Sequence, residues 1–141
     1  MQFPDLLPTN ANAPLGVGVD IESIDRFADR AYADHPAFYQ RLFSSEEIAY
    51  CQSRRHPAQH FAARFSAKEA AVKALHLYGR YYVRDFEVRK AADGAPILHI
   101  IRHRSECREP GSLTVSLSHC RTHAVAVVLA AGHAPLPAHQ P

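Results

Sequence analysis

Two acidic residues, far apart in the sequence, occupy positions suited to binding a metal ion. Asp20 ends an alternating segment whose glycines leave the backbone open on one face, and Glu69 lies at the edge of an apolar helical stripe. Each also has a purely structural interpretation. An aspartate caps a following helix well, and Glu69 can pair with Lys73 one helical turn later. Taken singly, neither residue decides between the two interpretations.

A lysine and a serine–histidine segment are further candidates. Lys68 falls inside the apolar stripe, so either its stem carries the ammonium out to water or the ammonium meets an anion. Ser116 and Ser118 alternate with apolar residues and are expected on the face away from the core, with His119 at the following turn. No GxSxG elbow accompanies this segment, which argues against acyl transfer by a nucleophilic serine.

Together these residues describe one chemistry better than any of them does alone. Asp20 and Glu69 can hold a hard cation such as Mg²⁺, which takes one or two carboxylates together with water and substrate phosphate oxygens. Lysines on the same predicted helix as Glu69 would neutralise phosphate charge, and the Ser116–His119 segment would donate hydrogen bonds. This constellation indicates phosphoryl-group transfer from a diphosphate, in which positioning and charge neutralisation dominate.

The sequence pattern predicts the elements that position these residues. Leu15–Ile21 alternates as a strand, with its apolar side chains expected to pack into the core and its glycine face left bare. Ala58–Leu77 is the longest helical signal, rich in alanine and free of proline. The other expected elements are helices over Glu22 to about Ala33 and from near Ser44, and two hairpins, Val83–Lys90 with Ile97–Arg102 and Leu113–His119 with Ala124–Ala130. Helices between hairpins favour an α+β fold, an antiparallel sheet with packed helices.

Length and composition limit the class of protein. At 141 residues the chain has room for one domain, expected to span residues 1–141 with an ordered core at about 15–130 and flexible arms at both ends. The net charge of +2 arises from interleaved basic and acidic residues, which argues against a nucleic-acid partner. No apolar run approaches the ~20 residues that span a bilayer, and the N-terminus lacks a secretory signal. We therefore expect a cytoplasmic protein with reduced cysteines and no membrane partner.

Three segments, in order and at suitable spacing, resemble the signatures of a known family. They read GVGVDIESIDRF, FAARFSAKEAAVKAL and LTVSLSHCRTHAVAVV. The family is the holo-[acyl-carrier-protein] synthases, the short single-domain 4′-phosphopantetheinyl transferases, and the resemblance covers about Leu15 to Leu129. It implies that family's α+β fold and Mg²⁺-dependent transfer of 4′-phosphopantetheine from coenzyme A to a serine of an apo acyl carrier protein. It also implies release of adenosine 3′,5′-bisphosphate and a homotrimer with sites between subunits.

The resemblance further implies a catalytic group. Asp20 and Glu69 match the family's metal-binding carboxylates. Lys73 and His119 match residues near the coenzyme A phosphates. These four residues are therefore the expected catalytic residues.

Other positions of the same signatures are expected to bind the cofactor or the partner. Arg64 and Lys68 are expected in the nucleotide pocket, and Ser116 is expected to contact the coenzyme A. Arg26 matches a basic position that contacts the acidic carrier protein. Arg30 lies one turn later on the same predicted helix face and is expected beside Arg26.

One loop departs from the family's pattern. The family usually has a glycine-rich turn before the next strand, whereas His76–Tyr82 here reads HLYGRYY, and the Ile101–Gly111 link also looks shortened. Because that loop borders the cofactor in relatives, the alternative function is a catalytically degraded relative that binds carrier protein without transfer. A third possible function is that of a Mg²⁺-dependent hydrolase. The sequence leaves open whether the carrier serves fatty-acid synthesis, polyketide synthesis or another specialised pathway. It also leaves open whether Glu69, His119 or a metal-bound water is the general base.

Overall fold

A computed structural model describes residues 14–132, so the predicted arms lie outside the described residues apart from Pro14 and Gly132. The elements mix helices with antiparallel strands, as the sequence predicts. In chain order they are β1 (Leu15–Ser23), α1 (Asp25–Ala28), α2 (Pro36–Leu42), α3 (Ser45–Gln52), α4 (Pro57–Ala74), the 3₁₀ turn η1 (Val83–Asp85), β2 (Phe86–Lys90), β3 (Pro96–Ile100), β4 (Ser112–His119) and β5 (His123–Ala131).

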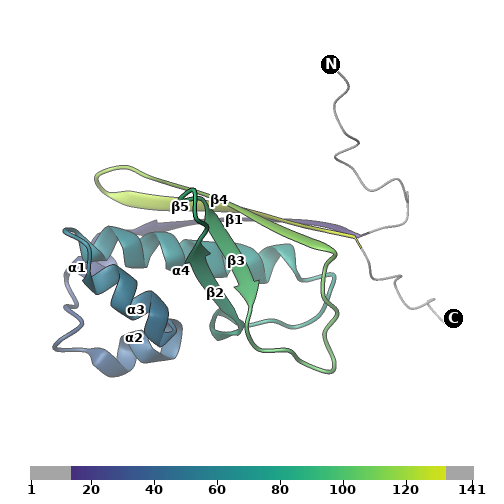
Figure 1. The fold of residues 1–141 in the computed structure, drawn as a ribbon, viewed down its shortest axis with the longest axis horizontal. Coiled ribbons are helices and arrows are strands. Elements are labelled where there is room, and N and C mark those ends of the chain that lie inside the picture. The colour runs from purple at the N-terminus through teal and green to yellow at the C-terminus, as the bar shows by residue number, and fades with distance from the viewer. Residues whose placement is uncertain (1–13, 133–141) are drawn as a thin grey trace, which may run out of the picture.

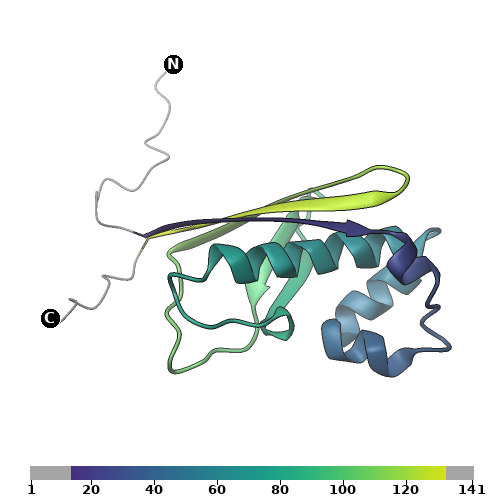
Figure 2. The same cartoon turned by 180° about the vertical axis from the view of Figure 1, so that it is seen from behind.

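Three strands form an antiparallel sheet in the order β1-β5-β4, and β2 and β3 form a separate hairpin. In the three-stranded sheet, Asp20 of β1 lies opposite Ala126 of β5, which lies opposite Leu117 of β4. Helix α4 runs along one face of this sheet, and α1–α3 gather at one end of it (Figures 1 and 2). The start of β1 and the end of β5 lie together at the opposite end of the sheet (Figure 1).

Strand β1 is present, but its two faces are reversed relative to the sequence prediction. Its glycine face packs on α4: a Cβ added at Gly18 would lie 1.8 Å from the carbonyl oxygen of Ala70, and Gly16 lies equally close to the helix. The apolar side chains that we expected in the core point outward, with exposed fractions of 52% for Leu15 and 66% for Ile21. The prediction failed because the backbone approach of α4, which only glycine permits, decides which face is buried.

Helix α4 is enclosed on almost all sides. Every residue from Phe61 to Lys68 is buried, so the predicted apolar stripe is only part of a buried surface that surrounds the helix. One core cluster joins the C-terminal half of α4 to both sheets, and an aromatic cluster joins its N-terminal half to α1–α3. Alanine is abundant in α4 because small side chains let neighbouring elements approach from several directions.

The helix predicted over Glu22 to about Ala33 is wrong in extent. Strand β1 continues through Ser23, paired with β5, and α1 covers only Asp25–Ala28. After α1 the chain turns, and the Tyr39 hydroxyl of α2 donates a 3.1 Å hydrogen bond to the carbonyl oxygen of Phe27. Strand pairing and this side-chain contact end the helix early. Helix α2 was not predicted from the sequence.

The remaining elements agree with the prediction to within a few residues. Helix α3 begins with a capping box, in which the Ser44 hydroxyl accepts from the Glu47 amide at 3.2 Å and the Glu47 carboxylate accepts from the Ser44 amide at 2.9 Å. None of the three cysteines of the described chain forms a disulfide. Between residues 14 and 132, no helix is long and apolar enough to cross a membrane.

Candidate active site

One flank of α4 meets β1 and brings together three of the residues predicted from the sequence. Lys73 Nζ lies 2.9 Å from Asp20 Oδ1 and donates a second hydrogen bond of 2.8 Å to the carbonyl oxygen of Val19. Glu69, one turn before Lys73, lies close enough for the charge of Asp20 to act on it. We call Asp20, Glu69 and Lys73 the acidic half-site. The close glycine contact of β1 with α4 creates it, because Asp20 shares the inward face of β1 with Gly18.

The surroundings of Glu69 disfavour its ionised form. Burial raises the pKa of Glu69 and the charge of Asp20 raises it further, while Lys73 and Arg26 act in the opposite direction. Within residues 14–132 there is no group of three or more histidine, cysteine or acidic side chains placed to hold a metal. The half-site therefore offers a carboxylate pair rather than a complete protein cage. Such a pair fits Mg²⁺, which takes its remaining oxygen ligands from water and substrate.

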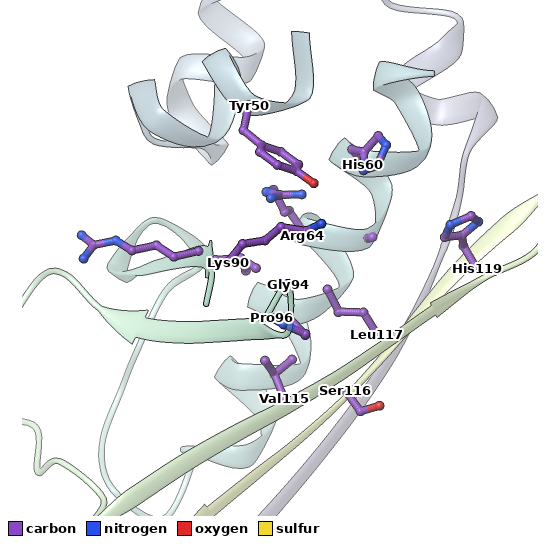
Figure 3. A pocket seen from close by; sticks show the side chains of 13 residues that line it. Tyr50, His60, Arg64, Lys90, Gly94, Pro96, Val115, Ser116, Leu117 and His119 are labelled. Carbon is purple, nitrogen blue, oxygen red and sulfur yellow. The ribbon is translucent and has the colours of Figure 1, made fainter. Parts of the chain in front are cut away.

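The other flank of α4 lines a pocket of about 300 Å³, shown in Figure 3. His60 and Arg64 come from α4 and Tyr50 from α3, whereas Lys90 and His119 stand at the ends of β2 and β4. We call these five residues the basic half-site. The other residues that border the pocket are Ala63, Val88, Arg89, Gly94, Pro96, Val115, Ser116 and Leu117.

Positive charge dominates the basic half-site. The buried Arg64 guanidinium lies 4.0 Å from the centre of the Tyr50 ring, and its Nε has no hydrogen-bond partner in the described chain. Burial lowers the pKa of His60, and the charge of Arg64 lowers it further. Burial alone would raise the pKa of Tyr50, but Lys90 and Arg64 bring it below its usual value. The pocket therefore suits an anion such as a phosphate group.

Two residues predicted to bind the cofactor do not present their polar groups to this pocket. The Ser116 hydroxyl points away from it, although its strand forms part of the wall (Figure 3). Lys68 is buried, with Nζ 2.5 Å from Glu47 Oε2 and 2.8 Å from the carbonyl oxygen of Leu42. Of the alternatives left open by the sequence, the ammonium meets an anion, and that anion is a carboxylate of the protein itself.

The two half-sites lie on opposite flanks of α4. Arg64 and Glu69 are five residues apart. At about 100° per residue, their side chains point about 140° away from each other. The sheet separates the half-sites as well, because Asp20 lies on edge strand β1 and His119 ends edge strand β4, with β5 between them. The predicted constellation is therefore not gathered into one pocket of the chain.

Arg26 and Arg30 do not share a helix face, because α1 ends before Arg30. Arg26 borders the acidic half-site: it pairs with Glu22 at 2.8 Å, and its guanidinium lies 4.6 Å from the ring centre of Phe65. Arg30 instead lies 5.1 Å from the ring centre of Phe38. The assumption that both arginines form one helical surface was wrong, and only Arg26 lies beside the carboxylates.

Three residues of the basic half-site were missed by the sequence analysis. His60 precedes Arg64 by four residues on a predicted helix, so helical spacing was a usable signal for it. Tyr50 and Lys90 come from other elements and reach the pocket only through tertiary packing. No local pattern in the sequence identifies them.

Comparison with known proteins supplies independent information on this arrangement. A family model described as the 4′-phosphopantetheinyl transferase superfamily matches residues 16–128. The holo-[acyl-carrier-protein] synthase of Moorella thermoacetica is 44% identical over 120 residues, which cover 82% of this chain and 92% of the relative. The Helicobacter pylori synthase crystallised with coenzyme A has a TM-score of 0.67 and 30% identity, covering 79% of this chain and 96% of that one. The Bacillus anthracis synthase in complex with CoA (3′,5′-ADP) has a TM-score of 0.66 and 26% identity, with coverages of 84% and 96%.

Proposed function

Because the chain belongs to the 4′-phosphopantetheinyl transferase superfamily, and within it to the holo-[acyl-carrier-protein] synthases, we propose that it transfers 4′-phosphopantetheine from coenzyme A to a serine of an apo acyl carrier protein. The observation that carries this proposal is the meeting of Asp20, Glu69 and Lys73 at one edge of the sheet. A protein that only bound the carrier would have no need of this pair of mutually repelling carboxylates. The product released is adenosine 3′,5′-bisphosphate.

The reaction exchanges a phosphoanhydride bond for a phosphodiester bond. The serine oxygen attacks the phosphorus that carries the pantetheine, and the bond from that phosphorus to the bridging oxygen breaks. The serine proton passes to a base or to water, and the leaving bisphosphate takes the electron pair of the broken bond. Catalysis then depends on holding the two groups in line and on neutralising the charge of the diphosphate.

Asp20 and Glu69 are the residues that would hold Mg²⁺. A partly buried pair of carboxylates fits an ion that binds one or two protein carboxylates together with phosphate oxygens. When bound, the ion would neutralise diphosphate charge. Lys73 has a side chain that is 52% exposed, so its ammonium is able to exchange Asp20 for a phosphate oxygen at small cost.

The basic half-site is the proposed binding site for the nucleotide phosphates of coenzyme A. The Nε of Arg64, which has no hydrogen-bond partner between residues 14 and 132, and the cations around His60 support this assignment. His119, at the mouth of the pocket, is the residue of this group proposed to act on the reacting end (Figure 3). Lys68 is left out of the proposal, because Glu47 already neutralises its ammonium.

We propose that the complete site forms between subunits of a homotrimer. A second copy of the chain would cover the exposed apolar outer face of the sheet, formed by Leu15, Val17, Val19, Ile21, Val127 and Leu129. The acidic half-site of one subunit would then face the basic half-site of its neighbour, so each contact joins two different surfaces. Heterologous contacts of this kind close into rings, of which a trimer is among the smallest.

Arg26 is the proposed contact for the acidic carrier protein. Its side chain is 41% exposed and lies next to the carboxylates, where the target serine must arrive. Arg30 would act as a separate contact on the turn beyond α1. Charges at an interface rim accelerate encounter more than they strengthen the complex. The proposed carriers are those of fatty-acid or polyketide synthesis in the cytoplasm.

The test is incubation of the protein with Mg²⁺, coenzyme A and apo carrier proteins of both pathways, followed by intact-mass spectrometry. We expect the mass increment of phosphopantetheine on the carrier, blocked by excess chelator and by replacing the carrier's target serine with alanine. Binding of the carrier without the increment would identify a degraded relative. Release of adenosine 3′,5′-bisphosphate without the increment would identify a hydrolase.

A further inference from the structure

A second pocket lies apart from both half-sites and is lined by residues of α1, of the β4–β5 turn and of the first turn of α4. These segments lie at the same end of the molecule (Figure 1). Its volume is about 680 Å³, within the range of small-molecule sites. It shares no residue with either half-site. Its existence and its use therefore do not depend on the proposed function.

The floor of this pocket is apolar and rigid. Phe27, Tyr39 and Phe61 are exposed by only 1–2% and form part of a continuous aromatic cluster. The Tyr39 ring contacts those of Phe61 at 4.5 Å and Tyr32 at 5.6 Å between centroids. Alanines of α1 and the turn after it complete the wall. These buried rings hold in place the half-buried side chains of Ile24, Tyr32 and Ala58, which line the pocket, so an apolar ligand would meet a preformed surface.

The rim of the pocket is cationic. Arg55, between α3 and α4, and Arg121, in the β4–β5 turn, both line it and are both exposed. Neither arginine makes a side-chain hydrogen bond, ion pair or ring contact within residues 14–132. None of the described residues that line the pocket is acidic. The first turn of the 18-residue helix α4 also borders the rim, and its positive dipole end adds to the same field.

We propose that this pocket binds an aliphatic carboxylate, such as a free fatty acid. Its hydrocarbon tail lies against the half-buried side chains of Ile24, Tyr32 and Ala58, which pack on the buried aromatic rings, and its carboxylate lies between Arg55 and Arg121. Two arginines that have no side-chain partner among residues 14–132 are suited to such a head group, because guanidinium and carboxylate form paired hydrogen bonds. A polar nucleotide would gain little from the apolar floor, and the basic half-site is the better place for it.

The proposal is tested with the fluorescent fatty acid 11-(dansylamino)undecanoate, bound to the full chain and displaced by unlabelled competitors below their micelle concentrations. The chain has no tryptophan, so intrinsic fluorescence does not interfere at the dansyl wavelength. The competitors are decanoate, methyl decanoate and decanol, which share a tail and differ in the head group. Methyl decanoate also represents a neutral acyl ester, as opposed to the free acid.

We expect decanoate to displace the probe about tenfold more strongly than the ester or the alcohol, since only the acid pairs with arginine. The variant Arg55→Glu/Arg121→Glu should weaken probe binding about tenfold or more. The matched control Arg41→Glu/Arg102→Glu changes the same number of exposed charges away from the pocket and should leave binding unchanged. Both variants are compared by thermal unfolding.

Several results would overturn the proposal. Equal displacement by acid, ester and alcohol would show that the arginines do not recognise the head group, and this arm needs no variant. Displacement of the probe by coenzyme A would show that the probe binds in the basic half-site and not in this pocket. Equal probe binding by the two double-arginine variants would also contradict the assignment. So would probe binding that weakens as the protein concentration rises, because a second copy of the chain would then cover the pocket.

Discussion

The negative charges of Asp20 and Glu69 repel each other, and the nearby ammonium of Lys73 offsets part of that repulsion. The carboxylate of Glu69 is partly buried, so both burial and Asp20 raise its pKa. The ionised form of Glu69 is thus disfavoured in the folded chain unless a cation lies nearby. A bound cation would stabilise the two neighbouring carboxylates in their ionised forms. For this reason we assign Asp20 and Glu69 to metal binding.

Removing either carboxylate should abolish transfer without unfolding the protein. Asp20→Asn and Glu69→Gln keep the side-chain shape and remove one charge, and we expect each to lower the transfer rate about 100-fold or more. Thermal stability of Glu69→Gln should be equal or higher, because the repulsion is removed. Glu46→Gln, an exposed carboxylate on α3, is the matched control. Full activity of either variant in excess chelator would contradict the metal assignment.

Two cysteines should differ strongly in reactivity. Burial raises the pKa of Cys51 to about 12, whereas hydrogen bonds from Thr122 and its neighbours lower the pKa of exposed Cys120 to about 7. Only the thiolate reacts with iodoacetamide. Labelling of Cys120, followed by peptide mass spectrometry, should therefore accelerate as pH rises through about 7 and level off above it. Cys51 should stay unlabelled in the folded chain.

The control for this measurement is Thr122→Val, which removes the side-chain hydrogen bond and should shift the midpoint for Cys120 to higher pH. Equal labelling of Cys51 and Cys120 at neutral pH would show that the core around Cys51 is open. A midpoint for Cys120 at the value of an ordinary thiol would show that the β4–β5 turn differs from the structure.

Among the elements, the contact between β1 and α4 positions the acidic half-site. Gly18→Ala would place a methyl group 1.8 Å from the Ala70 carbonyl oxygen unless the strand moves away. We expect a loss of about 1–3 kcal/mol in unfolding free energy, measured by denaturant titration. Transfer should fall further than stability does, because Asp20 moves with the strand. Thr114→Ala, on an outward face of β4, is the control, and a Gly18→Ala variant as stable as that control would refute the close contact.

Charge changes on the short helix α1 should alter the KM for the carrier protein and not the KM for coenzyme A. Arg26→Glu reverses an exposed charge beside the carboxylates, so we expect about a tenfold higher KM for the carrier at low ionic strength. The KM for coenzyme A should not change, and the salt dependence of transfer should flatten. Arg41→Glu on α2 is the matched control. An unchanged carrier KM at low salt would exclude Arg26 from the docking surface.

Strand β1 could be predicted from the sequence, but the face that it buries could not. The alternation of Leu15–Ile21 correctly predicted a strand, but alternation alone does not say which face is buried. The faces were assigned by hydrophobicity, whereas the glycine face packs because α4 approaches its backbone. The limits of α1 were missed for a related reason, since pairing with β5 extends the strand into the predicted helix.

For the whole molecule, the sequence correctly predicted the α+β fold and the family but not the division of the site. Asp20 and Glu69 were recognisable as a candidate carboxylate pair from residue type and position, the family resemblance added Lys73, and the structure brings the three together. Their separation from His119 depends on which flank of α4 each strand covers, which is a tertiary property. The exposed apolar outer face of the sheet is explained by the same arrangement if neighbouring subunits complete each other's sites.

The most direct test of this account is a subunit-mixing experiment. Glu69→Gln disables the acidic half-site, and Lys90→Ala/His119→Ala disables the basic half-site, so each variant alone should be nearly inactive. When the two are mixed, dissociated and reassembled, shared sites predict recovery of about one quarter of wild-type transfer, because random assembly pairs the two intact half-sites at that frequency. Adding Val19→Glu to both chains, which places a charge on the outer face of the sheet, should prevent recovery. Mixed oligomers, verified by a tag on one variant, that show no activity above the separate variants would contradict a site shared between subunits.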